Sequence, residues 1–116
     1  MYNFGLMNIR DIADEMDRLV KNKGWYEPGS KRPQTPKNMA VSLCIEAAEV
    51  LECFQWDDDA PDSGVLAAEL ADVMLYLLQL ARLSNIDLQK AVLEKIEVNY
   101  HRSWDQDKKE NHDKTN

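Results

Sequence analysis

The chain has 116 residues, of which 44% are hydrophobic, and carries a formal net charge of −7 at pH 7. This length and apolar content suit one domain, whereas the acidic balance argues against a general binder of duplex nucleic acid, which presents a basic face. No uninterrupted apolar run approaches the roughly 20 residues that span a bilayer, and Arg10 and Asp11 break any N-terminal signal pattern. We therefore expect a cytoplasmic protein in which Cys44 and Cys53 are free thiols.

Helical spacing of apolar residues predicts a first helix over residues 3–23, ended by Gly24. Residues 25–34, WYEPGSKRPQ, follow as a loop, because they contain a Pro-Gly turn and a second proline that hinders helix extension. Lys31 and Arg32 make this loop the most basic in an acidic chain. These two side chains either keep the loop soluble or contact the phosphate groups of a substrate.

Thr35 and Pro36 predict the start of a second helix, because threonine caps helix N-termini well and proline is tolerated at the first helical position. This helix is expected to reach Trp56, and its apolar residues lie on more than one side, so that it should contact more than one neighbour. An acidic linker over residues 57–62 leads to a third helix over residues 63–83. The third helix is the most apolar segment, and we expect it to be central.

A short connection ends at Asp87, the expected N-cap of a fourth helix over residues 88–102, and so short a link favours antiparallel neighbours. Trp104 is expected to dock onto the helices. Residues 105–116 contain no apolar side chain, which predicts a polar, disordered tail. Because no stretch alternates like a strand, the sequence predicts a single all-α domain over residues 1–104, built as a bundle of four main helices.

Two pairs of carboxylates lie inside apolar helical sequence, Glu46 with Glu49 and Glu69 with Asp72. Residues three apart are about 60° apart around a helix axis, so that each pair shares one face, and Glu52 continues the first row. Such carboxylates are costly unless they are paired or bind a cation, and few basic residues lie near them in sequence. Antiparallel packing of the two helices would bring the pairs together as hard oxygen ligands, which suit Mg²⁺ or Mn²⁺.

The two pairs allow other interpretations. An E-x-x-E pair is common on solvated helix faces, although two pairs in apolar helices weaken that reading. A di-iron bundle would need Glu-x-x-His motifs, and neither His101 nor His112 follows a glutamate at that spacing. We favour metal-assisted chemistry on a phosphorylated compound, since Mg²⁺ binds through a few carboxylates together with substrate phosphates.

The E-x-x-E motif at 46–49 and the E-x-x-D motif at 69–72, separated by 19 residues (50–68), resemble the signature of the MazG-like all-α nucleoside triphosphate pyrophosphohydrolases. This family includes the dCTP pyrophosphatases. The resemblance covers roughly residues 35–102. It includes the stretches TPKNM, FQW, ELADVMLY and VLEKI, together with Asn99 and Arg102.

The resemblance implies hydrolysis of a nucleoside triphosphate between its α and β phosphates, which yields a monophosphate and pyrophosphate. It implies that Mg²⁺ is bound by four carboxylates: Glu46, Glu49, Glu69 and Asp72. It also implies that one of these ligands, or Glu52, orients the attacking water. The catalytic candidates are therefore Glu46, Glu49 and Glu52. It also implies six substrate contacts: Lys37, Trp56, Tyr76, Lys95, Asn99 and Arg102. Packing is the alternative for Trp56 and Tyr76, and plain surface exposure for Lys95.

Members of the family typically assemble as dimers or dimers of dimers, so that the resemblance implies a homodimer or homotetramer. The acidic charge and the lack of a long apolar run lead us to expect neither nucleic acid nor a membrane as partner. The chain departs from the family pattern in the loop over residues 27–32, which bears on base preference more than on the reaction. It departs again at residues 100–103, where Arg102 replaces the usual basic group. The expected role is nucleotide-pool housekeeping. The alternative is a non-catalytic helical interaction or regulatory module of the same fold.

Overall fold

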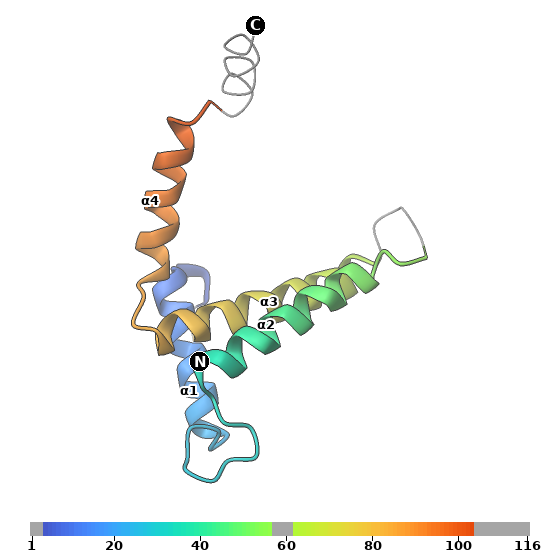
Figure 1. Ribbon diagram of the computed structural model, residues 1–116, viewed down its shortest axis with the longest axis vertical. Helices are drawn as coiled ribbons and strands as arrows, with labels where there is room; N and C mark the ends of the chain where they lie inside the picture. Colours follow the sequence, from blue (N-terminus) through green and yellow to red (C-terminus); the bar gives the residue numbers. More distant parts are fainter. Residues whose placement is uncertain (1–3, 57–61, 104–116) are drawn as a thin grey trace, which may run out of the picture.

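The computed structural model describes residues 4–56 and 62–103 (Figure 1). A short 3-10 helix, Phe4–Leu6, precedes four α-helices: α1 (Ile9–Asn22), α2 (Pro36–Glu52), α3 (Ser63–Leu83) and α4 (Leu88–Tyr100). The described residues contain no strand, so the predicted all-α class with four main helices is confirmed. The expectations for the tail at 105–116, for Trp104 and for the linker at 57–61 lie outside the described residues.

Local hydrogen bonds explain where the helices begin. Helix α1 starts at Ile9, later than predicted, because Asn8 and Asp11 form a capping box. In this box the backbone N–H of Asp11 donates to Asn8 Oδ1 at 2.9 Å, and the N–H of Asn8 donates to Asp11 Oδ2 at 3.1 Å. The N-caps of α2 and α4 are at the expected positions, Thr35 and Asp87, and Asp62 is the N-cap of α3. Helix α2 ends at Glu52 rather than at Trp56, because the chain continues as turns.

The helices α2 and α3 run antiparallel as a long arm, and α1 crosses the base of this arm (Figure 1). Helix α3 contacts all three other α-helices, which confirms it as the central helix. Helix α4 turns away from the arm, and in the part of the chain that the structure describes it contacts α1 and α3 but not α2. The predicted antiparallel packing of α4 is therefore wrong, and the four helices do not close around one axis.

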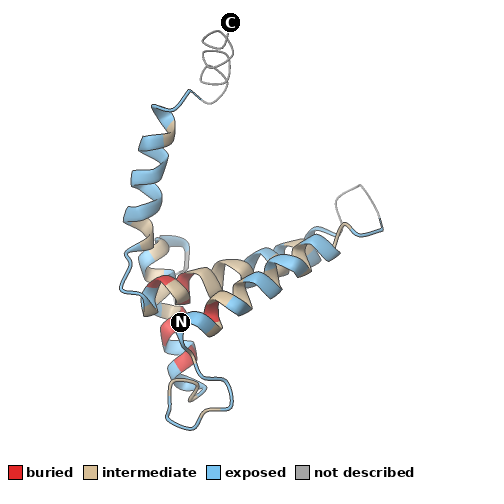
Figure 2. Cartoon of the chain, viewed as in Figure 1, coloured by how far each residue is buried: buried red, intermediate tan, exposed pale blue. Residues whose placement is uncertain are grey.

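The core is small and lies at the base of the arm, where α1 meets α3 (Figure 2). Its buried members are Met16, Val20 and Leu78, and Leu78 is only 1% exposed. Half-buried side chains from α1, the following loop, α3 and α4 surround them, among them Trp25 and Leu75. Most of α2 and the outer half of α3 therefore lie beyond the main core.

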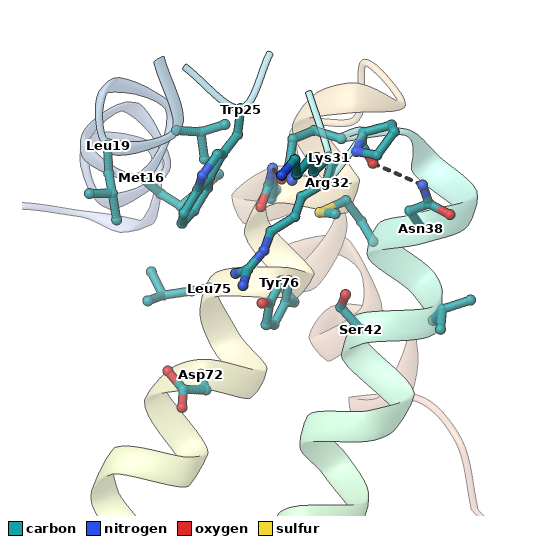
Figure 3. A pocket seen from close by; sticks show the side chains of 16 residues that line it. Met16, Leu19, Trp25, Lys31, Arg32, Asn38, Ser42, Asp72, Leu75 and Tyr76 are labelled. Atoms are coloured by element: carbon teal, nitrogen blue, oxygen red, sulfur yellow. Dashed lines mark hydrogen bonds between the residues drawn. The ribbon is translucent and has the colours of Figure 1, made fainter. Parts of the chain in front are cut away.

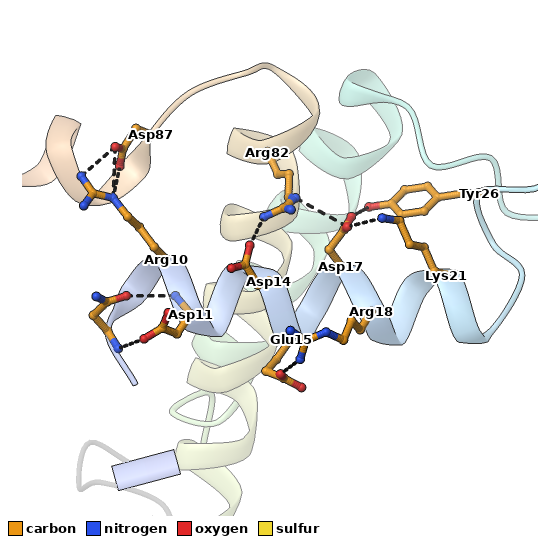
Figure 4. Close-up of polar contacts among 11 residues, drawn as sticks. Arg10, Asp11, Asp14, Glu15, Asp17, Arg18, Lys21, Tyr26, Arg82 and Asp87 are labelled. Carbon is orange, nitrogen blue, oxygen red and sulfur yellow. Dashed lines mark hydrogen bonds and ion pairs between the residues drawn. The ribbon is translucent and has the colours of Figure 1, made fainter. Parts of the chain in front are cut away.

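Ion pairs tie α1 to its neighbours (Figure 4). The buried Asp17 accepts a hydrogen bond from the Tyr26 hydroxyl at 2.9 Å and pairs with Lys21 and Arg82. Burial and the bond to Asp17 raise the pKa of Tyr26 to about 12, so this hydroxyl remains a donor at neutral pH. A further pair, between Arg10 and Asp87 at 2.7 Å, fixes the start of α4 against α1.

Large apolar side chains remain exposed on the arm and on α4. Ile45 is 55% exposed and Leu93 is 58% exposed. Seven further side chains are between 38% and 73% exposed: Val41, Leu51, Val65, Leu70, Val92, Ile96 and Val98. By length and composition alone, helix α3 is long and apolar enough to cross a membrane, with a mean hydropathy of 1.6, and a single such helix is weak evidence for a membrane span. Glu69 and Asp72 lie within it, and carboxylates are rare and costly in membrane spans.

Candidate metal centre

Three glutamates meet where α2 and α3 face each other. Carboxylate oxygens of Glu46, Glu49 and Glu69 all lie within 4.8 Å of one another, and all three side chains are half-buried. Glu46 and Glu49 are one turn apart on α2, and the antiparallel course of α3 brings Glu69 opposite them. A hard divalent cation binds oxygens at about 2.0–2.6 Å, so this spacing allows one ion to contact all three residues.

Asp72 lies beside this glutamate cluster (Glu46, Glu49 and Glu69) but outside the group of three. Its side chain is exposed, and its negative charge helps to raise the pKa values of both Glu46 and Glu69. Asp72 also lines the neighbouring pocket, so it joins the glutamates to that pocket. Glu52 is exposed farther along α2, and its charge reaches Glu69.

The electrostatics of the cluster favour uptake of a positive charge. Burial raises the pKa of Glu46 to about 7, with further contributions from a hydrogen bond to Glu49 and from repulsion by the neighbouring carboxylates. A hydrogen bond to Glu49, followed by burial, raises the pKa of Glu69. Oε2 of Glu46 and Oε2 of Glu69 are buried atoms without a hydrogen-bond partner among the described residues. The residues therefore fit a hard cation, which would compete with protons for these carboxylates and satisfy the unpartnered oxygens.

A pocket of about 580 Å³ opens next to the cluster, between α1, the loop at 25–34, α2 and α3 (Figure 3). One part of its wall is apolar and aromatic: Met16, Leu19, Val20, Trp25, Met39 and Leu75. The polar part consists of Lys31, Arg32, Gln34, Asn38, Ser42, Asp72, Tyr76 and Gln79. An apolar wall with a few convergent polar groups is typical of small-molecule sites.

A family model described as MazG-like matches residues 41–115. The chain belongs to the MazG-like family. The chain is 36% identical over 76 residues to dCTP pyrophosphatase 1 of Rattus norvegicus and, with the same figures, of Homo sapiens. Each of these alignments covers 58% of this chain and 45% of the relative, so the chain spans less than half the length of these curated relatives.

The fold is similar to the crystal structure of a pyrophosphatase from Archaeoglobus fulgidus, with a TM-score of 0.63 and 35% sequence identity. That comparison covers 78% of this chain and 87% of the solved one. The resemblance to the MazG-like family that the motifs indicated is thus confirmed, and it includes the helices that hold the glutamate cluster.

In this member of the MazG-like family, the structure brings only some of the substrate-contact candidates to the pocket. Tyr76 lines it, one turn from Asp72, whereas Lys37 lies exposed in the first turn of α2 outside the lining. Trp56 is 90% exposed beyond the outer end of α2. The other three candidates, Lys95, Asn99 and Arg102, lie on or just after α4, and none of them is among the residues that line this pocket.

Several pocket residues were not among the predicted contacts, although one signal identifies them. Glu69, Asp72, Tyr76 and Gln79 follow one another at intervals of three and four, so they form a single polar row along α3. The next position in this row after Tyr76 is Gln79, a glutamine in an apolar stretch of sequence. Its side chain is only 4% exposed. The equivalent row on α2 adds Ser42. No comparable periodicity marks Trp25 or Gln34, because the loop has no repeat.

Proposed function

We propose that the chain is a divalent-metal-dependent nucleoside triphosphate pyrophosphohydrolase that cleaves the α–β anhydride bond of its substrate. The observation that carries this proposal is the position of Asp72, which is shared between the glutamate cluster and the aromatic-walled pocket. A nucleotide lying with its base in the pocket and its phosphates toward Asp72 would meet a metal ion at the cluster. The dCTP pyrophosphatase relatives support the same reaction class.

In this proposal Glu46, Glu49, Glu69 and Asp72 hold Mg²⁺, or Mn²⁺ in its place. When bound, such an ion polarises phosphate oxygens and lowers the pKa of water. The residues of the chain align a water molecule with one phosphorus atom of the anhydride and accept its proton, for which the exposed Glu52, farther along α2, is available. The new P–O bond forms as the bridging P–O bond breaks, and pyrophosphate and the nucleoside monophosphate leave.

The test is pyrophosphate release from a panel of deoxynucleoside and ribonucleoside triphosphates, with Mg²⁺ and with EDTA. We expect release from at least one nucleotide that EDTA abolishes, because four carboxylates without an ion would repel the phosphates. Absence of release from every nucleotide at high protein concentration would favour the alternative, a non-catalytic interaction module. The relative rates within the same panel show which base the protein prefers.

We also infer a homodimer or homotetramer, from the apolar side chains that remain exposed on α2, α3 and α4. A second copy would cover them and would bring Lys95 and Asn99 of its α4, with the following Arg102, toward this pocket. The net charge and the carboxylates within α3 support a soluble, cytoplasmic protein that acts on free nucleotides, without nucleic-acid or membrane partners.

Light scattering on the purified chain tests the assembly. The expected molar mass is two or four times the 13.4 kDa of one chain. A charge placed in the exposed apolar surface, as in Leu93→Glu, should shift the mass toward one chain, since an unpaired charge in an apolar interface is costly. The exposed Lys90→Glu, on the same helix but outside the apolar set, is the matched control. A monomeric wild type would contradict the inference.

A further inference from the structure

The pocket has its own positive charges, opposite the acidic cluster. Its lining contains two cations, Lys31 and Arg32, both from the loop at 25–34. A nucleoside triphosphate carries three to four negative charges, and the residues proposed to face its phosphates are otherwise carboxylates. A metal ion offsets only part of this repulsion. A protein cation near the metal centre would therefore strengthen binding of the phosphate chain.

Arg32 is placed to supply that cation. Figure 3 shows its side chain extending into the pocket toward Tyr76, which is one helical turn from Asp72. Among the described residues the Arg32 guanidinium has no ion pair, whereas the three arginines Arg10, Arg18 and Arg82 each pair with a carboxylate. A guanidinium with its hydrogen-bond donors unused is suited to bidentate contact with a phosphate group.

The backbone of this loop is held in place on both sides of Arg32. The Arg32 N–H donates to Ser30 Oγ at 3.1 Å, and its carbonyl accepts from Gln34 Nε2 at 2.7 Å. The amide of the buried Gln79 on α3 in turn donates to Gln34 Oε1. Asn38 Nδ2 donates to the Pro33 carbonyl at 2.9 Å, which fixes the loop to α2. Such anchoring lowers the entropy cost of presenting Arg32 to a ligand.

We propose that Arg32 binds the phosphate chain of the nucleotide beside the metal centre, and that the Gln34–Gln79 amide pair positions the loop that carries it. The inference rests on the proposed function for the identity of the ligand. It adds a binding residue from a loop whose sequence departs from the family pattern.

The experiment measures equilibrium binding of inorganic pyrophosphate by calorimetry in the presence of Mg²⁺, so that neither turnover nor base preference enters. We expect Arg32→Gln to weaken binding by about 10- to 100-fold, the range of a charge-assisted hydrogen bond. Arg32→Lys should be intermediate, because it keeps the charge but loses the planar fork. Arg18→Gln, which removes a surface arginine outside the pocket, should bind like the wild type. Unchanged binding by Arg32→Gln, or no binding by the wild type, overturns the proposal.

A parallel assay separates this inference from the proposed function. If the wild type hydrolyses nucleotides and Arg32→Gln keeps the same KM, the Arg32 assignment is overturned while the function stands. If the wild type binds pyrophosphate with Mg²⁺ and Arg32→Gln does not, but no nucleotide is hydrolysed, the Arg32 assignment stands and the function fails. A KM increase with little change in kcat is the expected result for a residue that mainly binds.

Discussion

Replacing Glu49 with glutamine should lower pyrophosphate release by at least about 100-fold, measured as kcat/KM at saturating Mg²⁺. Glu49 is in the middle of the cluster, because its side chain interacts with both Glu46 and Glu69. Glutamine has nearly the same shape but no charge, and its amide nitrogen cannot ligate a cation. Loss of even an outer-shell partner typically costs 10- to 100-fold in metal affinity or activity, and loss of a ligand should cost more.

The same substitution should leave the fold intact, and the melting temperature checks this. Glu49→Gln removes one of three mutually repelling charges, so the metal-free protein should melt at the same temperature as the wild type or higher. Glu15→Gln is the matched control, since Glu15 lies on α1, away from the cluster, and pairs with Arg18. Full activity of Glu49→Gln would contradict the assignment of Glu49 as a metal ligand.

Affinity for Mg²⁺ should weaken by up to about tenfold for each pH unit below 7, because a cation must displace the proton of Glu46. The pKa of this carboxyl is raised to about 7, chiefly by burial. Calorimetric titration with MgCl₂ at about pH 6 and about pH 8 measures the effect. The variant Glu46→Gln should bind Mg²⁺ more weakly than the wild type at both pH values, and its affinity should differ much less between them. Equal affinity of the wild type at both pH values would contradict the prediction.

Without metal, the stability of the folded protein should fall as the pH rises, whereas the affinity for Mg²⁺ rises. The folded-state pKa of Glu46 lies above its value of 4.5 in the unfolded chain, so its contribution to stability is complete below 4.5 and is lost as the pH rises through about 7. Asp17 and Asp87 have lowered pKa values and stay ionised throughout this window. The melting temperature in EDTA should therefore fall as the pH rises toward about 8, and Mg²⁺ should restore it there. A melting temperature that rises with pH in the presence of EDTA would contradict the prediction.

Periodicity in the sequence was enough to predict the facing carboxylates, because the 3.6-residue repeat of a helix determines which side chains share a face. Glu46, Glu49 and Glu69 are therefore found together as expected. The path of α4 was not predictable in this way. It depends on the contact between Arg10 and Asp87, which are 77 positions apart, and on Asn85, whose φ of 58° turns the chain after α3.

Local sequence patterns could not predict the pocket either. Its loop is held by the bond from Gln79 to Gln34, which joins residues 45 positions apart, and a loop without periodicity gives no indication of such a partner. The sequence did identify Lys31 and Arg32 as candidates for phosphate contact, on charge alone. Whether they face solvent or a pocket depends on how the loop folds against α1 and α3.

The position of the core at the base of the arm separates the parts of this protein that different substitutions would affect. Met16, Val20 and Leu78 hold α1 against one end of α3, and the glutamate cluster lies farther out, between α2 and α3. The loop at 25–34 forms part of the wall of the pocket that opens next to the cluster. Insertions or exchanges in that loop can therefore alter which ligands fit, while the spacing of the carboxylates stays the same. A chain built in this way can acquire new selectivity without rebuilding its chemistry.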